Sequence, residues 1–168
     1  IAKSDWNKFK VKWNHYDEKA LDLLLNCDKE IALDANGSFS ISECQQLEEN
    51  PTSAQFTYIE QPMKTGISNY YYLNASKFAN WMADEDCQEQ TKLSDLKSHY
   101  KTINIKLVKT GGLTPALQLI KEARLNDFKI MIGCMTESTV GISAGAVLVS
   151  LVDYVDLDGA NLIANDIA

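Results

Sequence analysis

The sequence predicts an α/β fold with parallel strands, best described as an incomplete (β/α)8, or TIM, barrel of about seven βα units. Seven strand-like apolar runs alternate with segments of helical spacing, which returns each strand to the same end of a sheet. Five successive runs end on a charged residue, at intervals of 22 to 26 residues: Lys12, Asp34, Glu60, Asp84 and Lys106. Because (β/α)8 barrels carry their active sites at strand C-terminal ends, this pattern favours a barrel. An open doubly wound sheet, the alternative, would gather function at one switch point.

The expected strands are short apolar runs bounded by polar or turn-forming residues. In chain order they span residues 8–13, 31–36, 56–60, 80–84, 102–107, 129–135 and 154–158. A complete barrel has about 250 residues, whereas this chain has 168. We therefore expect one strand before Ile1 and one helix after Ala168 in a longer parent protein.

Two connecting segments, 17–26 and 115–125, show clear helical spacing. Their side chains expected to face inward are Leu21, Leu24 and Leu25 in the first and Leu117, Ile120 and Leu125 in the second. Pro115 is expected in the first turn of the second helix, behind Thr114 as its N-cap. We expect Tyr70, Tyr71 and Tyr72 to pack against the barrel from a helix. His15 and His99 are expected at the surface.

Composition excludes several classes of protein. The net charge is −7 and no basic cluster is interleaved with aromatic residues, which argues against a nucleic-acid partner. The longest apolar stretches, 128–135 and 140–152, are too short or too interrupted to span a bilayer. The four cysteines form no CxxC pair, so we expect reduced thiols, no zinc site and a cytoplasmic location. No charged-then-apolar leader begins the chain, so a targeting segment is expected to be absent or removed.

Three carboxylates end neighbouring expected strands, in the segments IALDAN, TYIEQP and MADED: Asp34, Glu60 and Asp84. Successive parallel strands place such side chains near one another, so the three could converge on one cation. Oxygen ligands without histidine or cysteine indicate magnesium or manganese rather than zinc. The alternative is that each acid caps the following helix or is solvated.

Lysines flank these carboxylates in the sequence. Lys10 and Lys12 share one strand face because they are two residues apart. Mutual repulsion of the two ammonium groups, and repulsion by a nearby metal ion, would favour a neutral Lys12 that can act as a base. A solvated pair on an edge strand is the alternative. Lys106, on the strand after the last acid, is expected roughly across the barrel from Lys12.

The C-terminal part of the chain offers further candidates. Asp156 and Asp158 are expected on one face of the last strand, where paired acids suit an ammonium group. A surface loop is the alternative. Segment 133–138, which includes Thr136, is expected to line the pocket, with Cys134 as a packing residue. Segment 109–112, KTGG, predicts a tight turn whose N–H groups could also approach a ligand.

Together these segments resemble the barrel domain of the enolase superfamily, muconate-lactonising subgroup, and most closely that of dipeptide epimerases. The resemblance covers nearly the whole chain. Its markers are KVK at 10–12, LDAN at 33–36, IEQP at 59–62, ADE at 83–85, NIKLVKTGG at 104–112, GCMTES at 133–138 and DLDG at 156–159.

The resemblance implies roles for these residues. It implies Mg²⁺, or Mn²⁺, bound by Asp34, Glu60 and Asp84. It also implies opposed acid/base lysines at Lys12 and Lys106, with Lys10 tuning Lys12, and a dipeptide ammonium group held by Asp156 and Asp158. The implied reaction is epimerisation of L-Ala-D/L-Glu-type dipeptides by two-base 1,1-proton transfer through an enediolate, and a homo-oligomer would fit. The alternatives are a cycloisomerase, an o-succinylbenzoate synthase or an N-acylamino-acid racemase of the subgroup, or an inactive barrel fragment.

Two departures from the family pattern stand out. Asp86 occupies a position where the family usually has a small hydroxyl residue, so we expect an added negative charge near the metal. The amino-terminal capping domain, which in this family closes the pocket, is absent from this chain.

Overall fold

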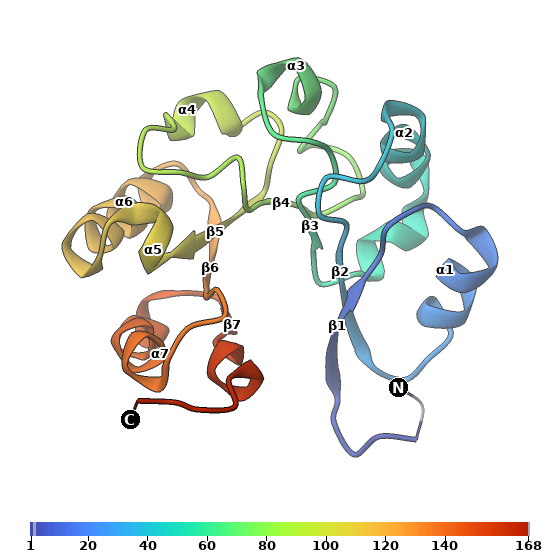
Figure 1. Ribbon diagram of the computed structural model, residues 1–168. Coiled ribbons are helices and arrows are strands. Elements are labelled where there is room, and N and C mark those ends of the chain that lie inside the picture. Colours follow the sequence, from blue (N-terminus) through green and yellow to red (C-terminus); the bar gives the residue numbers. More distant parts are fainter. Residues whose placement is uncertain (2, 168) are drawn as a thin grey trace. The chain divides into compact units, whose positions relative to one another are not determined.

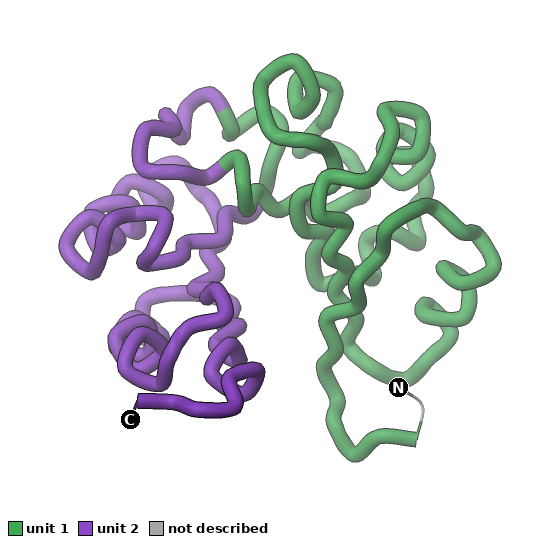
Figure 2. Tube along the Cα trace, viewed as in Figure 1, with its two compact units in different colours: residues 1–86, 96–101 green, residues 87–95, 102–168 purple. Residues whose placement is uncertain are grey.

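A computed structural model describes residue 1 and residues 3–167 as two compact units. Unit 1 comprises residues 1–86 and 96–101, and unit 2 comprises residues 87–95 and 102–168, apart from the undescribed residues 2 and 168 (Figure 2). In both units parallel strands alternate with helices in chain order (Figure 1). Among the described residues, no helix is long and apolar enough to cross a membrane.

Unit 1 is built on four parallel strands whose order follows the chain. They are β1 (Lys8–Lys12), β2 (Glu30–Asp34), β3 (Ile59–Glu60) and β4 (Trp81–Ala83). The connections contain α1 (Glu18–Leu25), α2 (Ile41–Glu49), η1 (Pro51–Gln55) and α3 (Ile67–Tyr70). Leu33, Ile59 and Trp81 are fully buried, so hydrophobic side chains on these central strands form the core that fixes the strand ends.

Unit 2 contains three parallel strands, again in chain order. They are β5 (Thr102–Lys106), β6 (Lys129–Gly133) and β7 (Tyr154–Asp156). The other elements along this part of the chain are α4 (Leu93–Leu96), α5 (Leu107–Thr110), α6 (Leu113–Leu125), α7 (Thr139–Ala146), η2 (Val149–Leu151) and η3 (Gly159–Leu162). Ile103, Ile105 and Ile132 are fully buried.

Helix starts in unit 1 follow from short polar side chains in the sequence. Asp17 caps α1 by accepting hydrogen bonds from the backbone N–H groups of Lys19 and Ala20, at 3.0 and 3.2 Å. Ser40 and Glu43 form a reciprocal capping box at the start of α2. Hydrogen bonds from Ser40 hold the pKa of the Glu43 carboxyl below its usual range. Such caps satisfy N–H groups that have no partner within the helix.

All seven predicted strands are present, but each is shorter than predicted. Residues 56–60 yield only the two-residue β3, which starts at Ile59, and Phe56 is the C-cap of η1. Strand β4 ends at Ala83 and β7 ends at Asp156, so Asp84 and Asp158 lie just beyond their strands. The prediction that Asp156 and Asp158 share a strand face is therefore wrong.

The predicted inward face of α6 is wrong in part. Ile120 is buried, but Leu125 is 84% exposed and Leu117 is also exposed. Small residues, Ala116 and Ala123, complete the buried face. Their spacing from Ile120, four and three residues, is helical, whereas a prediction weighted by side-chain size favours leucines. The helix also starts earlier than predicted, with Gly112 rather than Thr114 as its N-cap.

Three further side-chain predictions concern the aromatic and histidine residues of unit 1. Tyr70 is buried as predicted, but Tyr71 and Tyr72 are exposed, so packing of all three is wrong. His15 is exposed as predicted. His99 is half-buried, with its ring centroid 5.4 Å from that of Tyr70 and its Nδ1 2.7 Å from the Leu73 carbonyl oxygen, so its surface assignment is wrong.

Candidate active site

The charged residues of unit 1 form an ordered row at the strand ends. Lys12 pairs in register with Asp34, and Asp34 pairs with Glu60. Glu60 pairs with Met82, so Asp84, two residues further on, continues the same face. Asp34, Glu60 and Asp84 are all buried, with exposed fractions of 3%, 1% and 4%. Carboxylates this buried need compensating partners, and the row provides cations on the same face.

Both lysines of β1 reach these carboxylates. Lys12 Nζ lies 2.6 Å from Asp34 Oδ2 and also donates to Asn36 Oδ1. Lys10 Nζ lies 3.3 Å from Glu60 Oε2 and 3.9 Å from Asp34 Oδ2. The prediction that Lys10 and Lys12 share a face is thus confirmed. Both partners of Lys12 Nζ are oxygen acceptors, which can accept from an ammonium group. The predicted neutral state of Lys12 stays a prediction.

Asn36 is a site residue that sequence reasoning missed. Its backbone has a φ of 45°, in the left-handed region where asparagine is tolerated. In this conformation its N–H donates to Asp34 Oδ1 at 3.2 Å while its side chain accepts from Lys12. Asn36 therefore joins a proposed metal ligand to a proposed base. Its place in the LDAN segment was the available signal.

The Asp86 carboxylate lies in a buried network with Gln61, Gly66 and Tyr100. The expected added negative charge near the metal stays a prediction. Tyr100 donates its hydroxyl to Asp86 Oδ2 at 2.8 Å. Burial, and secondly the Asp86 charge, raises the pKa of Tyr100, so the hydroxyl remains a donor at neutral pH. The extra acid thus joins the segment after β4 to the segment after β3 and to Tyr100.

Unit 2 has a second row of candidate residues. Lys106 pairs in register with Gly133, and Gly133 pairs with Asp156. All three stand at the last positions of β5, β6 and β7. Lys106 and Asp156 are half-buried. The row therefore brings a predicted acid/base lysine and a predicted ammonium-binding acid to the same end of one set of strands.

The other predicted residues of unit 2 lie in loops. Thr136 is exposed in the loop after β6, and Asp158 is exposed at the start of η3. Cys134 is half-buried and accepts a hydrogen bond from the Gly159 N–H at 3.3 Å, which agrees with a packing role. Burial raises the pKa of the Cys134 thiol, which keeps it protonated and weakly reactive.

The KTGG segment departs from the predicted tight turn. Lys109 and Thr110 end helix α5, and only Gly111 and Gly112 link it to α6. Gly111 has a φ of 82°, the left-handed conformation that ends many helices on glycine. Lys109 folds back so that its Nζ donates to the Asn104 carbonyl oxygen at 3.0 Å.

Gly159, also missed from the sequence, fixes the position of Asp158. A Cβ atom at residue 159 would overlap the Met135 carbonyl oxygen and come within 3.0 Å of Cys134 Sγ. Backbone cannot yield as a flexible side chain can, so only glycine fits. Segment 158–159 is therefore pressed against the end of β6.

We expect Gly159→Ala to destabilise the chain by about 1–3 kcal/mol, the usual cost of overpacking. Denaturant unfolding monitored by circular dichroism measures this change. Gly141→Ala is the matched control, because its added Cβ would meet only the end of the Glu137 side chain and alanine favours a helix. Equal stability of Gly159→Ala and the wild type would show that the close approach is unimportant.

The donor set fits a hard divalent cation. Three buried carboxylates follow neighbouring strands on one face, and oxygens of Asp34 and Glu60 lie beside lysine ammonium groups. Oxygen-only donors of this kind suit Mg²⁺. Within residues 1 and 3–167, no three His, Cys, Asp or Glu side chains are gathered closely enough to hold a metal ion. Asp34, Glu60 and Asp84 would be the residues that hold the ion.

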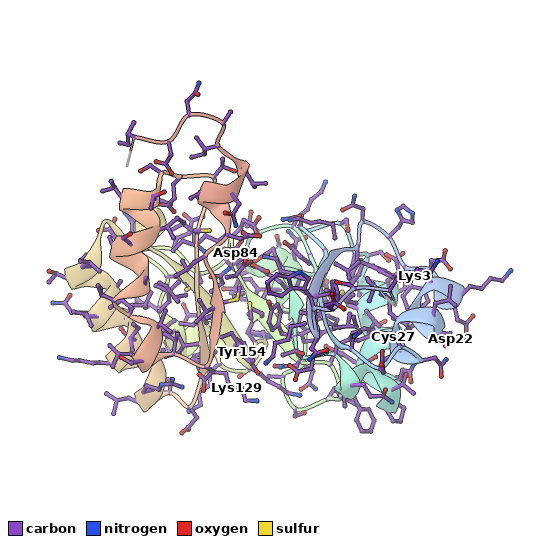
Figure 3. The ribbon with its side chains drawn as sticks, turned by 90° about the horizontal axis from the view of Figure 1, so that it is seen from below. Lys3, Asp22, Cys27, Asp84, Lys129 and Tyr154 are labelled. Carbon is purple, nitrogen blue, oxygen red and sulfur yellow. The ribbon has the colours of Figure 1, made fainter. Side chains whose placement is uncertain are left out.

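Among the residues that the structure describes, Cys27, Cys44, Cys87 and Cys134 form no disulfide. Cys27 lies just beyond α1, whose Asp22 is labelled beside it in Figure 3.

A hollow of about 630 Å³ in unit 2 is lined by none of the predicted site residues. Its lining is Ile120, Lys121, Arg124, Leu125, Ser150 and Leu151.

Comparison with known proteins decides the family. The Enolase C-terminal domain-like family matches residues 2–158. The chain belongs to this family. A curated L-Ala-D/L-amino acid epimerase from a Maribacter species is 37% identical over 174 residues, which is 100% of this chain and 51% of the relative. An L-Ala-D/L-Glu epimerase from Escherichia coli is 48% identical over 85 residues, 51% of this chain and 26% of the relative.

Solved structures agree with this assignment to the enolase C-terminal-like family. A family member from Agrobacterium tumefaciens with homology to dipeptide epimerases, with bound sodium and L-Ala-L-Glu, has a TM-score of 0.82 at 30% identity. It matches 95% of this chain and 50% of that chain. A dipeptide epimerase from Methylococcus capsulatus, complexed with Mg ion, has a TM-score of 0.79 at 26% identity, over 97% of this chain and 51% of that chain. These neighbours confirm the incomplete (β/α)8 barrel and the predicted resemblance.

The chain spans about half the length of the curated relatives that match all or nearly all of it, 51% and 49% for the first two. The family assignment therefore applies to the barrel portion of those proteins.

Proposed function

We propose that this chain is the barrel part of a Mg²⁺-dependent isomerase that epimerises dipeptides of the L-Ala-D/L-Glu type. The observation that carries the proposal is the register row Lys12, Asp34, Glu60 with Asp84 beside it. The row combines a base with three buried acids at strand ends, where (β/α)8 barrels perform chemistry. The names of the relatives support this choice of reaction.

The proposed metal role is limited to charge stabilisation. Bound by Asp34, Glu60 and Asp84, a magnesium ion would hold the substrate carboxylate and stabilise the negative charge that develops on proton loss. Lys10, which lies 3.3 Å from Glu60 Oε2, helps balance the charge of the carboxylates. Mg²⁺ requires near-ideal octahedral coordination, so its binding depends on where the three buried carboxylates are held.

Proton transfer is the work of two lysines. Lys12 or Lys106 removes the α-proton of the C-terminal residue of the dipeptide, giving an enediolate, and the other protonated lysine returns a proton to the opposite face. Inversion of the centre follows from this division of roles. The Lys12 ammonium is oriented by Asp34 and Asn36, which keeps its Nζ at the end of β1.

Asp156 and Asp158 supply the specificity for a dipeptide. Their carboxylates would accept charge-assisted hydrogen bonds from the substrate ammonium group. Gly159 holds Asp158 against the end of β6, as its contacts with residues 134 and 135 require. Thr136, in the exposed loop after β6, would line the same end of unit 2.

The proposal predicts that Asp156→Asn damages dipeptide turnover selectively. We expect kcat/KM for L-Ala-L-Glu to fall about 10- to 100-fold, because a hydrogen bond to a charged group contributes about 1.5–3 kcal/mol. An N-acylated amino acid, which lacks the ammonium group, is the comparison substrate. Equal losses on both substrates, or none on the dipeptide, would favour the N-acylamino-acid racemase alternative.

The remaining features of the proposal concern the setting of the enzyme. We propose that a capping domain outside this chain closes the pocket and selects the substrate side chain. Four cysteines that form no disulfide among the described residues fit a reducing compartment such as the cytoplasm. The acidic charge of −7 is consistent with a small-molecule substrate rather than nucleic acid as the partner.

A further inference from the structure

Gln61, directly after the proposed ligand Glu60, is buried and has an uncommon backbone conformation. Its side chain is 1% exposed, and its φ of 34° lies in the left-handed region, which is uncommon for residues other than glycine. Residues held in this region cost free energy and persist where their surroundings require them. The contacts of the Gln61 side chain show what it does there.

The Gln61 amide joins the loops that follow β3 and β4. Its Oε1 accepts from the N–H groups of Asp84 and Asp86, at 3.0 and 3.2 Å. Its Nε2 donates to the Met63 carbonyl oxygen and to Asp86 Oδ2, both at 2.8 Å. Two donors and two acceptor sites are thus all used, which is the full capacity of an amide side chain.

Asp86 closes the network from the other side. Besides Gln61 Nε2, its carboxylate accepts from the Tyr100 hydroxyl at 2.8 Å and from the Gly66 N–H at 2.7 Å. Asp86 and Tyr100 are 7% and 1% exposed, so water does not screen these bonds. The network therefore fixes residues 84–86 relative to the end of β3.

We propose that Gln61, Asp86 and Tyr100 form a positioning clamp for the metal ligand Asp84, which sets the affinity and selectivity of the site for Mg²⁺. The inference rests on the proposed magnesium site. Asp84 lies beyond the end of β4, so the strand ladder alone does not hold it. The backbone of Gln61 also donates to the Met82 carbonyl oxygen at 2.8 Å, which ties the Glu60 and Asp84 segments together.

The orientation of the Gln61 amide makes the clamp testable. Two backbone N–H groups require its oxygen on one side, and the Met63 carbonyl requires its nitrogen on the other. A flipped Gln61 amide would therefore lose these hydrogen bonds. In Asp86→Asn the new amide keeps one acceptor for the donors of Gly66, Gln61 and Tyr100, so a bond must break although the side chain keeps its shape.

The experiment is a Mn²⁺ titration of the chain followed by electron paramagnetic resonance, with Mg²⁺ and Ca²⁺ as competitors. We expect Asp86→Asn to weaken Mn²⁺ binding by about 10- to 100-fold, the range for outer-shell partners of metal ligands. Mg²⁺ affinity should fall more than Ca²⁺ affinity, because Mg²⁺ demands near-ideal octahedral geometry and Ca²⁺ tolerates variation. Tyr100→Phe, which removes one bond, should shift affinity in the same direction by less.

Glu48→Gln is the matched control. Glu48 is also a buried acid of unit 1, 5% exposed, and accepts hydrogen bonds from Trp81 Nε1 and the Asn74 N–H at 2.8 and 2.6 Å. We expect this variant to lose stability yet bind metal as the wild type does. Wild-type affinity and selectivity in Asp86→Asn, or equal losses in Asp86→Asn and Glu48→Gln, would overturn the clamp.

A separate variant distinguishes failure of the clamp from failure of the site. Asp84→Asn should abolish Mn²⁺ binding. If the wild type binds no Mn²⁺, or if Asp84→Asn binds as tightly as the wild type, the proposed metal site is wrong and the clamp falls with it. If Asp84→Asn loses binding while Asp86→Asn does not, only the clamp is wrong.

Discussion

Replacing Lys106 with alanine in the full-length protein is expected to abolish epimerisation, with a rate loss of at least about 100-fold and up to about 10⁴-fold, the range for a general acid or base. Lys106 ends β5 in register with Gly133 and is the only lysine of that strand. In the proposed two-base scheme, its loss leaves one face of the α-carbon without a proton donor or acceptor. Turnover of both diastereomers of Ala-Glu, followed by NMR, measures the effect.

Exchange of the substrate α-proton with solvent deuterium distinguishes a two-base mechanism from a one-base mechanism. Lys106→Ala should still exchange the α-proton of one diastereomer, and Lys12→Ala that of the other, because each variant keeps one lysine. Lys129→Ala is the control, since Lys129 stands at the opposite end of neighbouring strand β6, beside Tyr154 (Figure 3). Full activity of Lys106→Ala, or exchange of the same diastereomer by both variants, contradicts the two-base scheme.

Glu60→Gln is expected to remove metal binding and, with it, activity. Glu60 is 1% exposed and stands in the middle of the row, in register with Asp34 and Met82. The amide keeps the shape of the side chain but removes the negative charge that a hard cation requires. We expect metal affinity to fall by more than about 100-fold, because loss of an outer-shell partner alone costs up to about that much. Calorimetric titration with Mg²⁺ measures it.

Glu30→Gln is the control for this substitution. Glu30 begins β2, at the opposite end from Asp34, and its exposed carboxylate lies 2.9 Å from Lys8 Nζ. A surface pair of this kind contributes about 0–1 kcal/mol, so stability and metal affinity should hardly change. Glu60→Gln with the Mg²⁺ affinity of Glu30→Gln would exclude Glu60 as a ligand.

The strand ends were predictable from the sequence because they depend on local signals. An apolar run that ends on a charge identifies both a strand and its polar end, so Lys12, Asp34, Glu60 and Lys106 fall at the last residues of their strands as predicted. The parallel arrangement followed from the alternation of strands and helices. Fold class therefore needed no long-range information.

The supporting contacts were not predictable, because they join residues distant in the sequence. Gln61 and Asp86 are 25 residues apart, and Lys12 reaches Asn36 across 24 residues. Left-handed backbone at Asn36 and Gln61 carries no glycine signal. The hydrogen bonds of Asp86 could not be predicted because sequence order alone cannot show which way a loop side chain turns.

Dipeptide epimerisation is tested most directly by proton NMR of the full-length protein in deuterated buffer with Mg²⁺ and a small dipeptide panel that includes L-Ala-L-Glu. The proposed function predicts loss of the α-proton signal of the C-terminal residue together with growth of the other diastereomer, and no change when the metal is chelated. Absence of exchange on every dipeptide, with Mg²⁺ bound, would contradict it and favour a cycloisomerase or an N-acylamino-acid racemase.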